Sequence, residues 1–295
     1  MMQELSHISE ISDDYEAFFC DIWGVIHNGI AAYTPAVEAL RDLRAAGKYV
    51  ILITNSPSCS ADVQEQLHSF AIGAETYDAV VTSGDVTRHI IKATGRRIFF
   101  IGAEQNHRLF AGLDVCLVDE AAADSIVCTG PFGEAVFGKA QGNKVSHNGQ
   151  ILDDYRLLFE RFIKRDLPFV CANPDLAFDY GGQEMWCAGA LAKMYQEMGG
   201  RVLIAGKPYT PIYRLAIETL CALGGTDNKA RILAIGDGLD TDIKGAADFG
   251  INAVFIAAGL HRPHYMHAGR LNRSALMNFV VRAPYVPWAW LWVLQ

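Results

Sequence analysis

Short apolar runs that alternate with amphipathic segments constrain the fold more than any other feature of this sequence. Residues 18–20, 49–53 and 79–82 are such runs, which are typical of strands buried on both faces of a parallel sheet. Helical patterns fill the intervals between them, at about 34–46 and 60–70. The alternation predicts a doubly wound α/β sheet, with its functional site at the carboxyl ends of the strands.

The same alternation resumes after about residue 203, where strands are expected at 232–235 and 253–257. A helix is expected to begin at Thr210-Pro211, because threonine caps helices and proline suits the first helical position. Residues 1–82 and 203–295 are therefore predicted to be two halves of one core domain with a Rossmann-like sheet.

Residues 83–202 interrupt this core and show an alternation of their own. The expected strands are 98–101, 115–118, 126–129 and 169–172, and the expected amphipathic helices are 153–164 and 189–198. We predict that the segment is a second, inserted α/β domain.

The composition predicts a globular protein of the cytoplasm. Of the 295 residues, 51% are hydrophobic and 20% are charged, which suits a packed core. The formal net charge of −8 argues against general binding to nucleic acid or to an anionic membrane surface. Seven cysteines without a CxxC pair indicate reduced thiols, and we expect neither a signal peptide nor a membrane span.

The segment from Trp288 to Leu294 is unusually aromatic, with three tryptophans. We expect it to pack against the body of the protein. The alternative is a surface for self-association, since exposed apolar patches tend to bind partners.

Polar side chains that suit phosphoryl transfer follow the expected core strands. Asp21 ends the first strand, where a carboxylate can attack phosphorus, although an isolated aspartate there is usually a turn or cap residue. Thr54 ends the next strand, where a hydroxyl can donate to a phosphoryl oxygen or simply form a turn. Lys207 lies between Gly206 and Pro208 and can neutralise charge on the nucleophile and the phosphoryl group, the alternative being a solvated surface lysine.

Two later aspartates suit a magnesium site. Asp237 follows strand 232–235, and Mg²⁺ prefers one or two carboxylates with other oxygen ligands. We expect the ion to be held by Asp21, Asp237 and the backbone carbonyl of Trp23. Asp242 is expected in the outer coordination sphere or bound through water, unless it is only a carboxylate at a helix N-terminus.

Five segments together resemble subfamily IIA of the haloacid dehalogenase superfamily, which contains NagD-like and nitrophenylphosphatase-type enzymes. They are Gly24 to Gly29, Thr54-Asn55, Ala172-Asn173-Pro174-Asp175, Gly206-Lys207-Pro208, and Gly236-Asp237 with Thr241-Asp242. The likeness runs from about residue 18 to 258. It implies a Rossmann-like core, a C2-type cap over about 83–202, Mg²⁺ dependence and a small phosphomonoester as the substrate.

The resemblance also implies where substrate specificity arises. In such caps the segment that faces the core helps to select the leaving group, so Asn173, Asp175 and the loop 180–186 are candidates, although turn chemistry explains Asn173 equally well. Asn55 is a further candidate for substrate binding, and it also suits orienting the nucleophile loop or capping the next helix. Relatives with this cap often form dimers, so a homodimer is an expectation.

Trp23 departs from the family pattern, in which a second carboxylate follows the nucleophile by two residues. That carboxylate protonates the departing oxygen and then activates water, and an indole does neither. General acid–base help is worth roughly 10²–10⁴-fold, so we expect slow or specialised turnover, with the smallest loss for a good leaving group such as a phenolate. His27, in the same loop, is a candidate for substrate binding and for supplying part of the missing acid–base help, although loop histidines more often face solvent or serve structure.

Two hypotheses follow. In the first, the protein is a Mg²⁺-dependent phosphatase that hydrolyses a small phosphorylated metabolite through an aspartyl-phosphate at Asp21. In the second, it is a catalytically idle phospholigand-binding or regulatory protein on the same fold. Cleavage of carbon–halogen or carbon–phosphorus bonds is a further alternative, because superfamily members with those activities also lack the second carboxylate. The cap type, Asp237 and Asp242 favour phosphate.

Overall fold

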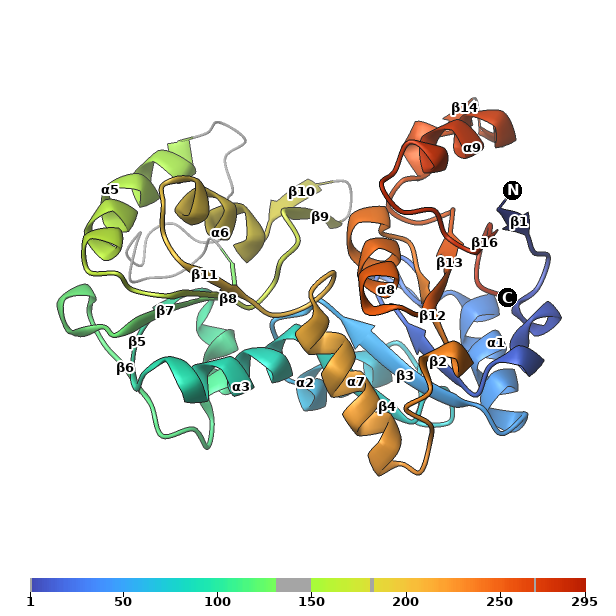
Figure 1. The fold of residues 1–295 in the computed structure, drawn as a ribbon, viewed down its shortest axis with the longest axis horizontal. Coiled ribbons are helices and arrows are strands. Elements are labelled where there is room, and N and C mark those ends of the chain that lie inside the picture. The colour runs from blue at the N-terminus through green and yellow to red at the C-terminus, as the bar shows by residue number, and fades with distance from the viewer. Residues whose placement is uncertain (1, 131–149, 181–182, 268) are drawn as a thin grey trace. The chain divides into compact units, whose positions relative to one another are not determined.

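The protein folds into two compact α/β units (Figure 1). The computed structural model describes residues 2–130, 150–180, 183–267 and 269–295. Unit 1 comprises Met1–Thr54, Val63–Val81 and Lys207–Gln295, and unit 2 comprises Asn55–Asp62 and Thr82–Gly206. Each unit contains a sheet of parallel strands, which confirms the predicted fold class.

The sheet of unit 1 has the strand order β1-β16-β13-β12-β2-β3-β4, and every pairing from β1 to β3 is parallel. Its strands are β1 (Gln3–Glu4), β2 (Ala17–Cys20), β3 (Tyr49–Thr54), β4 (Ala79–Thr82), β12 (Ile232–Gly236), β13 (Asn252–Ile256) and β16 (Ala289–Leu291). All of β2 and β12 is buried, as expected for continuous apolar runs in a central parallel sheet.

Helices flank this sheet. They are α1 (Thr34–Ala45), α2 (Ser60–Ser69), α7 (Thr210–Ala222), α8 (Lys244–Phe249) and α9 (Arg273–Val281), with short turns η1 (Ile8–Glu10), η2 (Ser12–Asp14), η5 (Lys229–Arg231), η6 (Leu239–Ile243) and η7 (Arg262–His264) and the ribbon β14 (Met266–His267) and β15 (Arg270–Leu271). The predicted threonine cap of α7 is wrong by one position. The helix already includes Thr210, and its N-cap is Tyr209, which makes no side-chain capping bond.

The order of the strands places the two halves of unit 1 against each other at β2 and β12. From β2 the chain proceeds outward through β3 and β4, and from β12 it proceeds in the opposite direction through β13 and β16. The pair β2–β12 is therefore the point at which the strand order reverses. Ligands of open α/β sheets bind at the carboxyl ends of such a pair.

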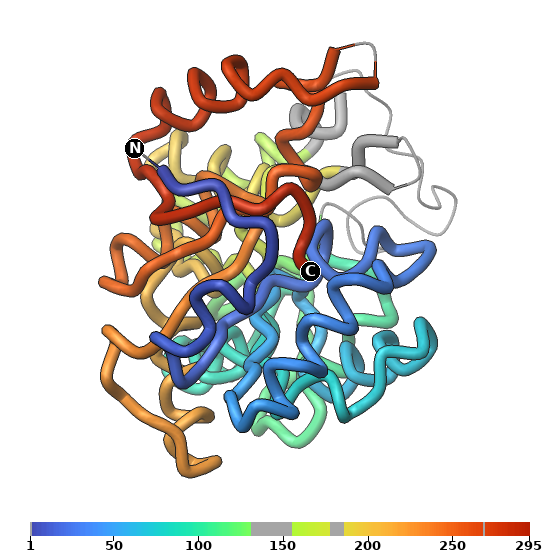
Figure 2. The backbone as a smooth tube through the Cα atoms, turned by 90° about the vertical axis from the view of Figure 1, so that its right-hand side faces the viewer, coloured from blue at the N-terminus to red at the C-terminus, as the bar shows by residue number. Residues whose placement is uncertain are grey.

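The aromatic C-terminal segment packs into the sheet, as expected. Strand β16 lies between β13 and β1, and Figure 2 shows the N-terminal segment beside the C-terminal one. Trp290 is 1% exposed, whereas Trp288 is 39% exposed. Much of the segment that the alternative would use for self-association is therefore buried within the chain.

Unit 2 has a five-stranded parallel sheet with the order β11-β8-β7-β5-β6. Its elements are α3 (Ser83–Thr94), β5 (Arg97–Ile101), η3 (Glu104–Phe110), β6 (Cys116–Leu117), η4 (Glu120–Ala122), β7 (Ser125–Cys128), α5 (Gln150–Lys164), β8 (Phe169–Cys171), the antiparallel pair β9 (Ala177–Tyr180) and β10 (Gln183–Trp186), α6 (Ala188–Glu197) and β11 (Val202–Ile204). Apolar side chains cover both faces of the sheet.

Strand β11 lies in the sheet of unit 2, where Val202, Leu203 and Ile204 pair with β8. After β11 the chain returns to unit 1 at Lys207. Within the described residues, no helix combines the length and the apolar character that crossing a membrane requires.

Candidate active site

Three buried aspartates meet at the carboxyl edge of the sheet in unit 1. Asp21 follows β2, Asp237 follows β12, and Asp242 lies in η6. Each offers a carboxylate oxygen, and these oxygens all lie within 4.8 Å of one another. The backbone N–H of Asp21 donates to the carbonyl of Ile235 at 2.8 Å, which extends the β2–β12 pairing up to the nucleophile candidate.

Lys207 joins two of these carboxylates. Its Nζ donates to Asp21 Oδ1 at 2.5 Å and to Asp242 Oδ1 at 2.7 Å, and a third bond reaches the carbonyl of Ile53 at 3.2 Å. The residue is only 3% exposed. Burial disfavours its charged form, but Asp21 and Asp242 outweigh burial and raise the pKa of Lys207 well above its ordinary value. The lysine is therefore a fixed cation beside Asp21.

One ammonium does not balance three carboxylates. Burial raises the pKa of Asp21 to about 7, with Lys207 opposing the shift and Asp242 adding to it. Burial and the charge of Asp21 also raise the pKa of Asp237 well above its ordinary value. A buried all-oxygen donor set with excess negative charge fits a hard divalent cation such as Mg²⁺.

Backbone groups from two loops hold Asp237. Its Oδ2 accepts a hydrogen bond from the N–H of Leu260 at 2.7 Å. A Cβ on Gly24 would lie 2.1 Å from this oxygen, and a Cβ on Gly259 would lie 2.0 Å from it. Both positions therefore need glycine. Sequence reasoning missed Gly259, although it follows a core strand at the edge where the site was expected.

Thr54 ends β3 and is buried, next to the Ile53 carbonyl that accepts from Lys207. All three catalytic candidates therefore lie in unit 1. Asp21 and Thr54 lie at the carboxyl ends of β2 and β3, and Lys207 bonds the carboxylate cluster directly.

The other substrate-binding candidates, except His27, lie together in unit 2. Asn55 Nδ2 donates to Asp175 Oδ1 at 2.9 Å, and the Asp175 N–H donates to Asn173 Oδ1 at 3.1 Å. The loop predicted at 180–186 belongs to the β9–β10 hairpin, and its residues 181 and 182 lie outside the described residues.

His27 lies inside the loop that follows Asp21. It is 2% exposed, and its ring contacts Trp23 edge-on at 5.3 Å and Phe70 at 4.9 Å, measured between centroids. Its Nδ1 accepts from the N–H of Gly29 at 3.0 Å, and burial lowers the pKa of His27 to about 4. These contacts favour a role in shaping the loop over the substrate contact expected from the sequence.

Trp23 packs against the same loop. It is half-buried, and a Cβ on Gly29 would lie 2.2 Å from Cη2 of the indole. Gly29 also has a φ of 82°, which disfavours other residues. The loop therefore accommodates the large side chain at position 23 because position 29 has no side chain.

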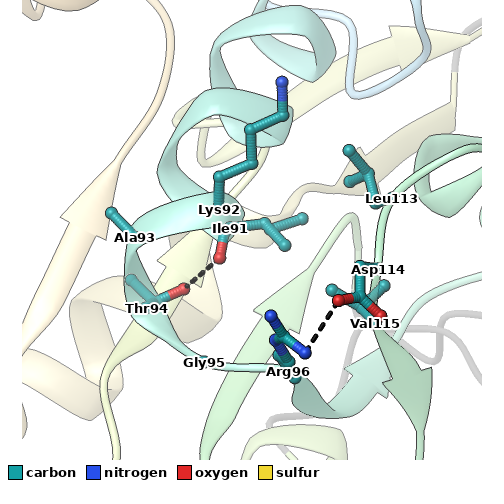
Figure 3. Close-up of a pocket in the computed structure, with 9 residues that line it drawn as sticks. All are labelled: Ile91, Lys92, Ala93, Thr94, Gly95, Arg96, Leu113, Asp114 and Val115. Carbon is teal, nitrogen blue, oxygen red and sulfur yellow. Dashed lines mark hydrogen bonds and ion pairs between the residues drawn. The ribbon is translucent and has the colours of Figure 1, made fainter.

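A separate cavity of about 470 Å³ lies in unit 2 between α3 and the segment before β6 (Figure 3). Its charged residues Arg96 and Asp114 form an ion pair at 2.8 Å, and the Thr94 hydroxyl donates to the Ile91 carbonyl at 3.2 Å. Both members of the ion pair are largely exposed. We assign this cavity no part in the chemistry, because its Arg96, Asp114 and Thr94 side chains already bond groups that line it.

Two family descriptions match this chain. Residues 18–116 match a haloacid dehalogenase-like hydrolase model, and residues 204–278 match a second HAD-hydrolase-like model. The matched segments include Asp21, Thr54, Lys207, Asp237 and Asp242.

The chain is also similar to individual proteins. A solved structure of a hydrolase of the haloacid dehalogenase-like family from Brucella suis 1330 is 42% identical, with 99% of this chain and 100% of that chain covered and a TM-score of 0.83. A 4-nitrophenylphosphatase from Schizosaccharomyces pombe is 23% identical over 80% of each chain. The ribonucleotide monophosphatase NagD of Escherichia coli is 25% identical, with 82% of this chain and 87% of the relative covered.

Proposed function

The chain belongs to the haloacid dehalogenase-like hydrolase family, and on that basis we propose that it is a Mg²⁺-dependent phosphatase acting on a small phosphomonoester. The observation that supports this most is the buried Lys207 bridging Asp21 and Asp242 within a cluster of three carboxylates. Relatives named as phosphatases point in the same direction.

In the proposed reaction an oxygen of Asp21 forms a bond to phosphorus while the ester P–O bond breaks and the leaving group departs as an oxyanion, which takes its proton from solvent. Lys207 donates to Oδ1 of Asp21 and so orients the attacking carboxylate. The Thr54 hydroxyl donates to a phosphoryl oxygen, and Lys207 offsets the negative charge on the transferred group. Water then bonds to phosphorus, which releases inorganic phosphate and restores the Asp21 carboxylate.

Mg²⁺ would be held by Asp21, Asp237 and the backbone carbonyl of Trp23. When bound, it would neutralise phosphate charge that the net charge of −8 otherwise repels. Asp242 has two tasks in this arrangement. Its Oδ1 orients Lys207, and its Oδ2 accepts from the N–H of Gly238 at 3.0 Å, which shapes the loop after Asp237.

Trp23 restricts the range of phosphate esters that the proposed reaction would hydrolyse quickly. Because the indole supplies no proton, turnover should be fastest for esters whose leaving group departs as a stable anion. His27 is proposed to shape the loop and not to act as a proton donor, since it is buried and its pKa is lowered.

We propose a small phosphorylated metabolite as the substrate and residues 83–202 as a cap. Within that cap, Asn173 and the 180–186 loop would select the leaving group.

Release of nitrophenol from 4-nitrophenyl phosphate tests this proposal, with and without Mg²⁺ and with Asp21→Asn in parallel. Its leaving group needs little protonation, so the assay isolates the nucleophile and the metal from the missing acid. We expect steady Mg²⁺-dependent release that Asp21→Asn abolishes. A single equivalent would mean that the phosphoenzyme forms but does not hydrolyse. No release at all would contradict the proposed phosphatase activity and favour the second hypothesis, a catalytically idle phospholigand-binding protein.

A further inference from the structure

Three junctions where the chain passes between the units adjoin the catalytic candidates or the ends of core strands. They lie at 54/55, 81/82 and 206/207, and a fourth falls within α2. Thr54 is the last residue of unit 1 before one junction, and Lys207 is the first residue after another. Asn55 and Gly206, which belong to unit 2, are therefore bonded covalently to two proposed catalytic residues.

On the unit 2 side these three junctions meet. The Ser83 hydroxyl donates to the carbonyl of Ala205 at 3.2 Å. A Cβ on Gly206 would lie 2.6 Å from Asn55 Oδ1 and 2.9 Å from Ser83 Oγ, and Gly206 has a φ of 90°. The segments that begin at Asn55, begin at Thr82 and end at Gly206 are thus packed so closely that only glycine fits at position 206.

On the unit 1 side two of the same segments are also joined. Lys207 Nζ donates to the carbonyl of Ile53 at 3.2 Å, in addition to its bonds with Asp21 and Asp242. The segments 53–55 and 206–207 therefore run together on both sides of their junctions. Any shift of Asn55 relative to Gly206 displaces Thr54 relative to Lys207.

A side-chain hydrogen bond holds Asn55 within unit 2. Asn55 is 6% exposed and donates through Nδ2 to Asp175 Oδ1 at 2.9 Å. The acceptor is itself held in place, because a Cβ on Gly189 in α6 would lie 2.1 Å from the Pro174 carbonyl and 2.5 Å from that of Asp175. The loop carrying Asp175 thus packs directly on the backbone of α6.

We propose that the Asn55–Asp175 hydrogen bond is a positioning device, here named the junction latch, which aligns Thr54 and Lys207 for phosphoryl transfer. Asn55 and Asp175 are then positioning residues, in place of the substrate contacts expected from the sequence. The inference rests on the proposed function, since its kinetic readout is phosphatase turnover. Misplacing a catalytic group by about 1 Å lowers the rate by up to about 10²-fold without removing a contact to the substrate.

Asn55→Asp is the informative substitution, because it keeps the shape and Oδ1 and changes only the donor. It places two carboxylates against each other at the latch. With 4-nitrophenyl phosphate and saturating Mg²⁺, we expect kcat to fall about tenfold or more and KM to change by less than about threefold. Asp175→Asn alone retains an acceptor oxygen, so its kcat should stay within about threefold of the wild type.

The double variant Asn55→Asp, Asp175→Asn restores a donor–acceptor pair with its direction reversed. We expect its kcat to return to within about threefold of the wild type. Independent substrate contacts would instead give a KM that rises in Asn55→Asp and does not recover in the double variant, and that result would overturn the proposal. A failure of kcat to recover would also overturn it.

Asn106→Asp is the matched control. It makes the same chemical change in unit 2, at a residue whose Oδ1 accepts from the Thr129 hydroxyl at 3.3 Å and remains an acceptor as aspartate. We expect no change in kcat.

If the wild type shows no turnover, the proposed function fails, and the junction latch is then tested separately by thermal unfolding. Asn55→Asp should then lower Tm and the double variant should restore it, and a double variant that unfolds as early as Asn55→Asp would refute the latch.

Discussion

At the scale of single residues, Trp23 stands where the proposed mechanism lacks an acid, and it is also a structural part of its loop. Its indole contacts His27 edge-on and occupies space that a side chain at position 29 would need. A substitution at this position therefore changes packing as well as chemistry. To separate the effect on packing from the effect on chemistry, two variants are needed that lose the same indole contacts and differ only in whether the new side chain can transfer a proton.

Trp23→Asp and Trp23→Asn form such a pair. Both should lower Tm to a similar extent, because both remove the indole from its contact with His27 and Gly29. Only the aspartate can give and take a proton, so Trp23→Asp should hydrolyse an alkyl phosphate about 10²-fold faster than Trp23→Asn. Initial rates of phosphate release at matched folded concentrations measure this. Equal rates would show that the missing acid does not limit turnover.

Gly259 offers a second prediction at this scale. In Gly259→Ala the new Cβ would lie 2.0 Å from Asp237 Oδ2 and 2.4 Å from its Cβ, so the carboxylate must move. We expect a Mg²⁺ affinity at least about tenfold weaker, measured from the Mg²⁺ dependence of turnover and by calorimetric titration.

Gly47→Ala is the control for Gly259→Ala. Gly47 has a φ of 77° and nothing within 4 Å of a built Cβ. Alanine there should cost roughly 1–2 kcal/mol of stability through backbone strain and leave Mg²⁺ affinity unchanged. If both variants weakened Mg²⁺ binding equally, the steric explanation for Gly259 would be wrong.

At the scale of elements, the last strand shows how one short segment completes the sheet. Strand β16 pairs with β13 on one side and with β1 on the other, so its loss would leave β1 without a neighbour. Trp290 points into the core from this strand and is among the largest fully buried side chains. Trp288, two residues earlier, is partly exposed.

Trp290→Ala should therefore destabilise the protein by about 3 kcal/mol, the low end for removing a buried aromatic. The low end is expected because the indole N–H has no hydrogen-bond partner among the described residues, so its removal recovers part of the cost. Trp288→Ala is the matched control and should cost less than about 1 kcal/mol. Urea unfolding measures both. Similar losses in the two variants would contradict the assigned burial.

At the scale of the whole molecule, metal binding and stability should be linked. A divalent ion that binds the folded carboxylate cluster and not the unfolded chain stabilises the fold, by about 2.7 kcal/mol at a concentration of 100 Kd. Tm should therefore rise when Mg²⁺ replaces EDTA. Asp237→Asn should abolish most of this rise, whereas Asp240→Asn, at an exposed neighbouring carboxylate, should retain it. A rise of equal size in both variants would place the ion elsewhere.

Local patterns were sufficient to predict most elements. The strands at 79–82, 232–236 and 252–256 lie within one residue of their expected limits, because continuous apolar runs bounded by polar residues have few other structures available. Helix α3 was not predicted, although its capping box between Thr82 and Asp85 is a sequence signal for a helix start. Strand β1 has two residues and no apolar pattern, so only its partner β16 defines it.

The sequence alone determined the fold class, the family resemblance and the polar residues that follow each core strand, because these depend on local patterns and on motifs a few residues long. The tertiary structure decided which of those residues meet. Asp21 and Asp237 become neighbours only because β2 pairs with β12, and Lys207 reaches both Asp21 and Asp242 from a separate loop. Phe70, from a separate segment, also packs on the buried His27, and Asn55 meets Asp175 across 120 positions of sequence; no local pattern encodes contacts made across such separations.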